Sequence, residues 1–308
     1  MRREAGLFRV PRWLRTTVAV LVILLCFFYL ARTLWLGARQ VDWSEVTVRP
    51  GPLLLSTVLF AVATLIGGLC WSLLLEGLGQ RHPLRANLKT HLRANVAKYL
   101  PGYAWQILGK AYLCRVQGLP MGPVAVGIGL EFGTVILTGV WVALVTAPSA
   151  WLELLGVGQL VGWRWPLAAA LGAFLVGLPW CLRLVFERIE MVRRRTESIR
   201  VSVRPLWWML LWMILAWLLL GLAVYGLIAS LSTIHLGQWP AVTSGWAASA
   251  ILSLVVVFVP MGIGVKESAL TFFLSPLLPA ALAAVVAVLA RVLTILGEAL
   301  CFVIAQRL

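Results

Sequence analysis

The sequence predicts an all-α integral membrane protein with about six transmembrane helices and two re-entrant helical hairpins. Hydrophobic residues make up 61% of the chain and charged residues only 12%, whereas soluble domains are roughly half apolar and about a quarter charged. Apolar runs of about 20 residues recur, which is the length that crosses ~30 Å of hydrocarbon. Basic residues gather in alternate loops between these runs, as the positive-inside rule requires.

The first span is expected at 16–37, directly after a basic segment at 1–15. A charged segment before a short apolar run also fits a signal peptide. Apolar character resumes beyond Arg32, however, and the small residues near Gly37 make a poor cleavage site, so we expect an uncleaved span. The other expected spans are 52–75, 121–147, 165–182, 206–230 and 280–304.

Two further apolar stretches are too short or too irregular to cross the membrane alone. One surrounds Pro101, and the other contains the runs Trp246–Val259 and Ser268–Leu278 on either side of Pro260. Apolar runs of this length are typical of re-entrant segments. Each stretch is therefore expected to form a re-entrant helical hairpin.

The distribution of basic residues predicts the topology. The chain holds 26 Lys and Arg against 11 Asp and Glu, and most of the basic residues fall in 1–15, 77–119 and 183–205. Six crossings with both termini in the cytoplasm account for this partition. The basic charge also suits attraction to anionic lipids, and no nucleic-acid partner is expected. The prediction is a single polytopic membrane domain over 1–308, in the cytoplasmic (inner) membrane of a bacterium or archaeon.

An internal repeat is visible in this layout. Residues 52–147 contain a span, a hairpin broken at Pro101-Gly102 and a second span. Residues 206–304 repeat that order from the opposite side of the membrane, after the basic cytoplasmic loop 183–205. Inverted repeats with broken helices in matching places indicate a transport site near the midplane. The alternative is that Pro and Gly are simply common in membrane helices.

The first motif runs from Lys98 to Lys110 and is interrupted by Pro101 and Gly102. The break frees backbone groups that protein or water must satisfy. Upstream, a cationic stripe at four-residue spacing could hold anionic headgroups or merely anchor the helix at the inner interface. The residues of this stripe are Arg85, Lys89 and Arg93.

The second motif surrounds the other break and contains Pro260, Gly262, Gly264, Lys266 and Glu267. Glycines allow close backbone approach, and the helix that follows presents an N-terminus of partial positive charge. A lysine beside it makes phosphate a reasonable guest.

Isolated charges inside the spans form the third group. Glu131 and Arg291 lie near the middle of their spans, and Glu298 is seven residues beyond Arg291 on the same helical face. Such charges mark a functional path, or they pair with one another and stabilise the bundle, for example Arg291 with Glu267 or Glu131. The expected cationic partners of Glu131 are Arg291 and Lys266 in the opposite repeat.

Neither a metal site nor an organic cofactor is expected. The five cysteines and three histidines are scattered, with no CxxC or HExxH spacing, and no Walker motif is present. Any driving force is therefore expected to be a proton gradient or downhill flow.

The two motifs resemble the signatures of the lysylphosphatidylglycerol synthase transmembrane (flippase-like) family over nearly the whole chain. The residues that carry the resemblance are Lys98, Tyr99, Pro101, Gly102, Trp105, Gln106, Gly109, Lys110, Gly118, Glu131, Pro260, Gly262, Gly264, Lys266, Glu267 and Arg291. Lys110 and Lys266 stand where arginine is common in that family. The resemblance implies a protein that moves lipids or lipid-linked precursors between leaflets, without the synthase domain.

The resemblance and the charges together suggest roles for individual residues. Headgroup or phosphate binding is expected from Arg93, Lys98, Tyr99, Trp105, Gln106, Lys110 and Lys266. Gating or proton coupling is expected from Glu131, Glu267, Arg291 and Glu298. The hairpin breaks are expected at Pro101, Gly102, Pro260, Gly262 and Gly264.

These sequence features bear on three classes of function. The preferred one is a non-enzymatic flippase for an anionic phospholipid or a polyprenyl-phosphate precursor. A lipid transferase would need a carboxylate pair or a metal site, and the chain has no DxD and a single aspartate, Asp42. The third class is a scaffold or accessory subunit of a lipid- or glycan-modifying enzyme. A homo-oligomer and a partner enzyme both remain open.

Overall fold

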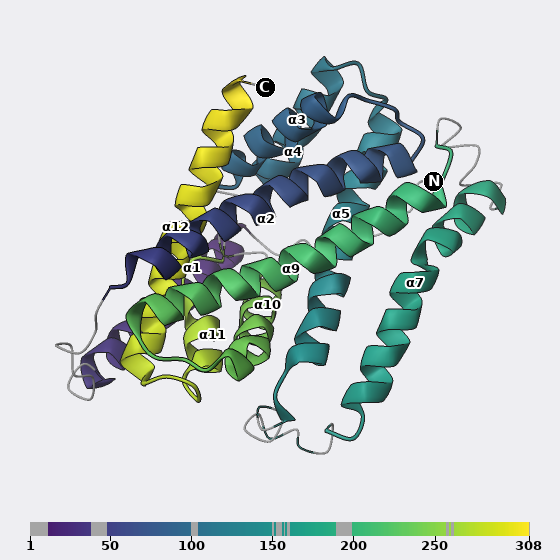
Figure 1. Ribbon diagram of the computed structural model, residues 1–308. Helices are drawn as coiled ribbons and strands as arrows, with labels where there is room; N and C mark the ends of the chain where they lie inside the picture. The colour runs from purple at the N-terminus through teal and green to yellow at the C-terminus, as the bar shows by residue number, and fades with distance from the viewer. Residues whose placement is uncertain are drawn as a thin grey trace.

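The computed structural model describes residues 12–37, 48–99, 104–149, 151, 156, 158, 161–188, 199–256, 259 and 262–307. These residues form helices and connecting turns, with no strand among them (Figure 1). The helices are α1 (Arg12–Gly37), α2 (Pro50–Gly77), α3 (Leu84–Val96), η1 (Ala97–Tyr99), α4 (Ala104–Val116), α5 (Met121–Thr146), α7 (Arg164–Arg188), α9 (Val203–Leu231), η3 (Leu236–Gln238), α10 (Trp239–Val255), α11 (Val265–Leu274) and α12 (Ala280–Arg307).

Within the part of the chain that the structure describes, five helices are long and apolar enough to span a membrane, and they match five of the predicted spans. They are α2, α5, α7, α9 and α12, with 25 to 29 residues each. A helix of 25 residues is ~38 Å long at 1.5 Å per residue, which exceeds the hydrocarbon thickness. The first predicted span, 16–37, lies within α1, which has 26 residues.

Helices α2 and α9 pack side by side along their whole length in opposite directions (Figure 1). At one end the amide of Arg49 donates to the carbonyl of Ser230 at 2.8 Å, and at the other end Ser202 donates to Gly77 at 2.8 Å. Between them, the Ser56 hydroxyl donates to the Ala223 carbonyl at 2.7 Å. From each of these hydrogen-bonded pairs to the next, the residue number rises along α2 by as much as it falls along α9. The two helices are therefore antiparallel, with no shift in register between them.

The remaining helices are arranged in corresponding ways on either side of this central pair. Helix α3 packs on α2, α4 and α12, while α10 packs on α9, α11 and α5. Helix α4 contacts α5 as α11 contacts α12. Helices α2, α3, α4 and α5 therefore correspond in order to α9, α10, α11 and α12. Each contact named above has a counterpart between the corresponding helices.

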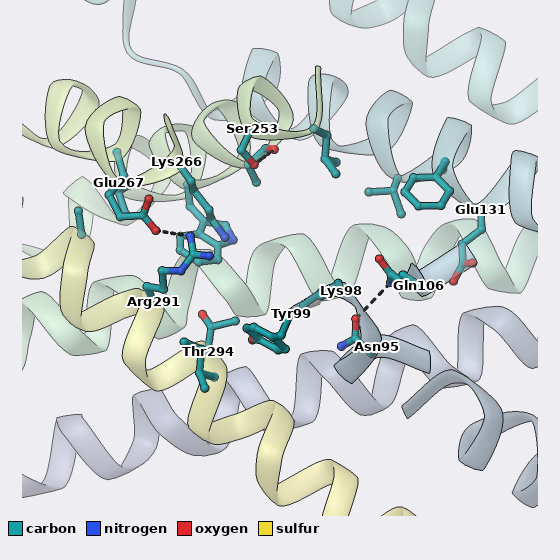
Figure 2. Close-up of a pocket in the computed structure, with 18 of the residues that line it drawn as sticks. Asn95, Lys98, Tyr99, Gln106, Glu131, Ser253, Lys266, Glu267, Arg291 and Thr294 are labelled. Carbon is teal, nitrogen blue, oxygen red and sulfur yellow. Dashed lines mark hydrogen bonds and ion pairs between the residues drawn. The ribbon is translucent and has the colours of Figure 1, made fainter. Parts of the chain in front are cut away.

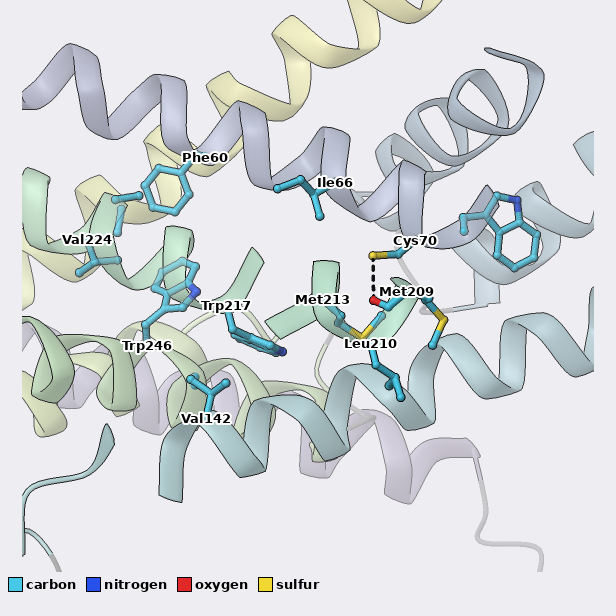
Figure 3. Packing of buried hydrophobic residues seen from close by; sticks show 14 of the residues in the cluster. Phe60, Ile66, Cys70, Val142, Met209, Leu210, Met213, Trp217, Val224 and Trp246 are labelled. Atoms are coloured by element: carbon cyan, nitrogen blue, oxygen red, sulfur yellow. Dashed lines mark hydrogen bonds between the residues drawn. The ribbon is translucent and has the colours of Figure 1, made fainter. Parts of the chain in front are cut away.

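A continuous apolar core fills the space between α2, α5, α9 and α10 (Figure 3). Phe60 of α2 and Trp246 of α10 pack with ring centroids 5.5 Å apart. The Cys70 thiol lies 3.6 Å from the Met209 carbonyl, where α2 and α9 approach closely. Because lipid tails are as apolar as these side chains, close packing rather than water exclusion holds the helices together.

Four short helices occupy the places where re-entrant hairpins were predicted. Helices α3 and α4 have 13 residues each, α10 has 17 and α11 has 10. The longest is ~26 Å at 1.5 Å per residue, which is below the hydrocarbon thickness. The apolar runs did not mark the ends of these helices. Helix α10 begins at Trp239, before the run at Trp246, because Pro240 suits the first turn of a helix. Helix α11 begins at Val265, beside the lysine where the helix N-terminus was expected.

Candidate functional site

The short helices meet the long helices α5 and α12 around a cavity of about 300 Å³. Residues of the first half of the chain (48–149) and of the second half (199–307) line it. Their charged and polar side chains face one another in Figure 2. The polar lining residues are His91 and Asn95 of α3, Lys98 and Tyr99 of η1, Gln106 of α4, Glu131 of α5, Ser253 of α10, Lys266 and Glu267 of α11, and Arg291 and Thr294 of α12. Phe132, Val135, Trp246, Leu254 and Ile295 are among the apolar ones.

Lys110 and Glu131 form a buried ion pair at one end of the cavity. The Lys110 ammonium donates to both carboxylate oxygens at 2.5 and 2.7 Å, and its side chain is only 3% exposed. It also lies 3.1 Å from Nδ1 of His91 and 4.2 Å from the ring centre of Trp71. An ammonium can only donate, so Nδ1 of His91 accepts and the imidazole is uncharged in this arrangement.

A second ion pair connects the two halves of the chain. The Lys98 ammonium of η1 donates to Glu298 of α12, and the neighbouring Tyr99 hydroxyl donates to the other oxygen of the same carboxylate at 2.7 Å. The Glu298 side chain is 7% exposed. Two donors from η1 therefore satisfy one carboxylate of α12.

Glu267 and Arg291 form the third ion pair, between α11 and α12. The guanidinium donates to Oε1 of Glu267 at 2.5 Å, and the backbone amide of Gly264 donates to Oε2 at 2.7 Å. Glu267 therefore has two tasks, because it caps the N-terminus of α11 and pairs with α12.

Lys266 differs from the three paired cations. Its ammonium lies 3.6 Å from the ring centre of Trp246, a cation–π contact. Among the residues that the structure describes, no carboxylate pairs with it. The described charges in and directly behind the cavity are thus four cations and three carboxylates.

The turn before α11 requires glycine at two positions. Gly262 and Gly264 have φ angles of +57° and +82°, a region that L side chains rarely adopt. A Cβ on Gly262 would also lie 2.5 Å from Cβ of Ser253 on α10. These glycines let the chain turn tightly from α10 into α11 and place Lys266 and Glu267 in the first turn of α11.

The structure brings most of the sequence-predicted site residues together. Lys98, Tyr99, Gln106, Glu131, Lys266, Glu267 and Arg291 line the cavity, and Lys110 and Glu298 lie behind it as ion-pair partners. Arg93 points elsewhere and donates to Gln306 near the end of α12 at 2.6 Å. Trp105 is half-exposed and is not a lining residue. Pro101, Gly102 and Pro260 lie outside the described residues.

One expected pairing is wrong. Glu131 was expected to pair with Arg291 or Lys266 of the second half, but its partner is Lys110 of the first half, with Nδ1 of His91 3.3 Å from the same carboxylate. The reason is that α4 packs against α5, which places Lys110 beside Glu131, whereas Arg291 is held by Glu267 of the adjacent α11.

Sequence reasoning missed His91, Asn95 and Trp246. A signal for the first two was present, because Asn87, His91 and Asn95 recur every four residues and so share one face of α3. Asn87 and His91 are indeed buried. Trp246 gave no such signal, since its contact with Lys266 depends on how α10 packs against α11.

The fold and the site define an all-α, membrane-embedded protein with a charged cavity enclosed by its helices. No protein-family model matches the chain, and no curated protein matches it. Among the described residues, no group of three or more His, Cys, Asp or Glu could hold a metal ion.

Proposed function

We propose that this protein is a lipid flippase, which moves an anionic phospholipid or a lipid-linked precursor of the polyprenyl-phosphate type between the leaflets of a cytoplasmic membrane. The observation that carries the proposal is that the described cavity has one more cation than it has carboxylates. Lys266 lies in a cavity whose other described charges are already paired. A partly buried ammonium without a carboxylate partner is costly, so an anion from outside would stabilise it.

The arrangement of the helices supports transport. The antiparallel α2 and α9, with the corresponding contacts around them, are what an inverted repeat over 52–147 and 206–304 would produce. In such proteins broken helices form the substrate site at the interface of the repeats. The cavity lies between the short helices of both halves.

In the proposed mechanism the lipid headgroup enters the cavity while its tails remain in the bilayer. Lys266 neutralises the phosphate, and the neighbouring ion pairs rearrange as the cavity opens toward one leaflet or the other. Glu131, held by Lys110, is the proposed proton-coupling residue, because protonation would release Lys110. The multi-pass topology of the proposal has both termini in the cytoplasm.

The test is leaflet-resolved translocation in proteoliposomes that contain the purified protein. Fluorescent phosphatidylglycerol should move between leaflets faster than in protein-free vesicles, and Lys266→Gln should abolish the acceleration. The matched control is Arg183→Gln, which removes a cation from an exposed pair on α7. A wild-type protein that accelerates no labelled anionic lipid would contradict the proposal and favour the scaffold or accessory role.

A further inference from the structure

The charge count within the cavity bears on the class of lipid that fits it. The proposed function leaves open whether the headgroup is a phosphodiester or a phosphomonoester, and whether it carries an amine. A phosphodiester has one negative charge, whereas a phosphomonoester has about −1.5 to −2 at pH 7. The inference that follows rests on the proposed function and refines its substrate.

The described cavity offers one unmatched positive charge. Lys98, Lys110 and Arg291 each have a carboxylate partner within hydrogen-bond distance, and His91 is uncharged where it accepts from Lys110. Lys266 contributes the remaining charge, against the indole of Trp246. A monoanion balances this cation, while a dianion leaves a negative charge uncompensated in an apolar surrounding.

The same count excludes a cationic headgroup. Glu131, Glu267 and Glu298 are the carboxylates of the described cavity, and each already pairs with a cation. Glu267 also accepts from the amide of Gly264, and Glu298 also accepts from Tyr99. An ammonium on the lipid would find no unmatched carboxylate among them. It would also lie near Lys266, and like charges repel strongly in a desolvated site.

Neutral polar groups complete the lining. The Gln106 amide nitrogen donates to the Asn95 side-chain oxygen at 3.3 Å, which leaves the nitrogen of Asn95 as a donor and the oxygen of Gln106 as an acceptor. The Thr294 hydroxyl lines the same cavity. Amides and hydroxyls with both donor and acceptor capacity suit the hydroxyl groups of a polyol or a sugar.

We infer that the site selects a phosphodiester lipid whose headgroup is uncharged and hydroxylated, such as a glycerol or a single sugar. The phosphate lies against Lys266, and the hydroxyls face the amides of α3 and α4. The cavity volume of about 300 Å³ is at the lower end of ligand sites, which favours a small headgroup over an extended glycan.

The test is equilibrium binding to the full chain in detergent, with three dioctanoyl lipids as probes. Phosphatidylglycerol carries one charge and hydroxyls, phosphatidic acid is a phosphomonoester, and phosphatidylethanolamine adds an amine. Hydrogen bonds to charged groups contribute about 1.5–3 kcal/mol, so phosphatidylglycerol should bind at least ~10-fold more tightly than either of the others at pH 7.5.

Variants that change the charge count sharpen the test. Lys266→Gln should remove the preference for phosphatidylglycerol, and Lys266→Arg should retain it. Glu298→Gln leaves Lys98 unmatched while its amide can still accept from Tyr99, so it should shift the preference toward phosphatidic acid. Arg183→Gln on α7 is the control with unchanged preference. Monodisperse size-exclusion profiles establish that each variant folds.

The inference is overturned if phosphatidic acid or phosphatidylethanolamine binds wild-type protein as tightly as phosphatidylglycerol, if no probe binds, or if Lys266→Gln keeps the wild-type preference. Translocation of the same lipids in proteoliposomes separates this result from the proposed function. Selective, Lys266-dependent binding without translocation would retain the inferred headgroup class and refute the flippase.

Discussion

Lys98 of η1 and Glu298 of α12 are 200 residues apart in the chain and form an ion pair in the structure. Within the described residues, it is the only ion pair between 48–149 and 199–307. The other two buried pairs each join neighbouring helices of one half. This ion pair adds to the contacts of α3 with α12, which include the hydrogen bond from Arg93 to Gln306.

Removing the charge of Lys98 should loosen that contact. Lys98→Gln deprives Glu298 of its cation but leaves the hydrogen bond from Tyr99. We expect a loss of about 1–3 kcal/mol in the free energy of unfolding, measured by thermal or denaturant unfolding in detergent. The charge swap Lys98→Glu with Glu298→Lys should recover part of the loss. If Lys98→Gln unfolds at the wild-type midpoint, the pair does not hold the halves together.

The Lys110–Glu131 pair should be more sensitive, because both side chains are nearly inaccessible. Removing one partner of a buried pair costs about 3–5 kcal/mol, since the other charge is stranded. Lys110→Gln and Glu131→Gln should each lower the unfolding midpoint, and the double variant should be more stable than either single variant. Additive losses in the double variant would show that the two residues are not energetically coupled.

Gly262 should tolerate no side chain. Gly262→Ala combines a positive φ angle with a Cβ contact at 2.5 Å to Ser253, so we expect a loss of about 1–3 kcal/mol. Gly129→Ala on α5 is the matched control, because its Cβ would meet no atom within 4 Å and alanine favours helix. Thermal unfolding of both variants measures the difference, and equal midpoints would refute the requirement for glycine.

The proposed topology gives a further test. A reporter fused after Leu308 should be active in the cytoplasm if both short-helix pairs re-enter the membrane rather than cross it. The matched fusion between the first two predicted spans, within 38–51, should report the opposite side. A C-terminal reporter that is active only outside would mean that one of these helix pairs adds a crossing, and the inverted repeat would be lost.

The long helices could be predicted from sequence because length and apolar composition determine them locally. The predicted spans 52–75 and 121–147 differ from α2 and α5 by two residues or fewer at each end. The charged site residues could also be predicted, because a charge within an apolar run is costly unless it faces the interior. In the structure Glu131, Lys266 and Arg291 do line one cavity.

The partners of these charges could not be predicted in the same way. Which cation meets Glu131 depends on whether α4 or α12 packs beside it, and that is a property of the tertiary arrangement. The cation–π contact of Trp246 with Lys266 also depends on how the helices pack. Arg93 was expected at the site because of its spacing, but its bond to Gln306 requires the end of α12 to lie against α3.

The unmatched charge of Lys266 has a consequence for the electrical work of transport. If the cavity moves relative to the membrane field, the loaded state carries a cation and a monoanion together and is neutral, so voltage neither assists nor opposes that step. The empty state carries one positive charge, and moving it through the whole field changes its energy by about 2.3 kcal/mol per 100 mV. A membrane potential would then act on the return of the empty protein and set the direction in which lipid accumulates.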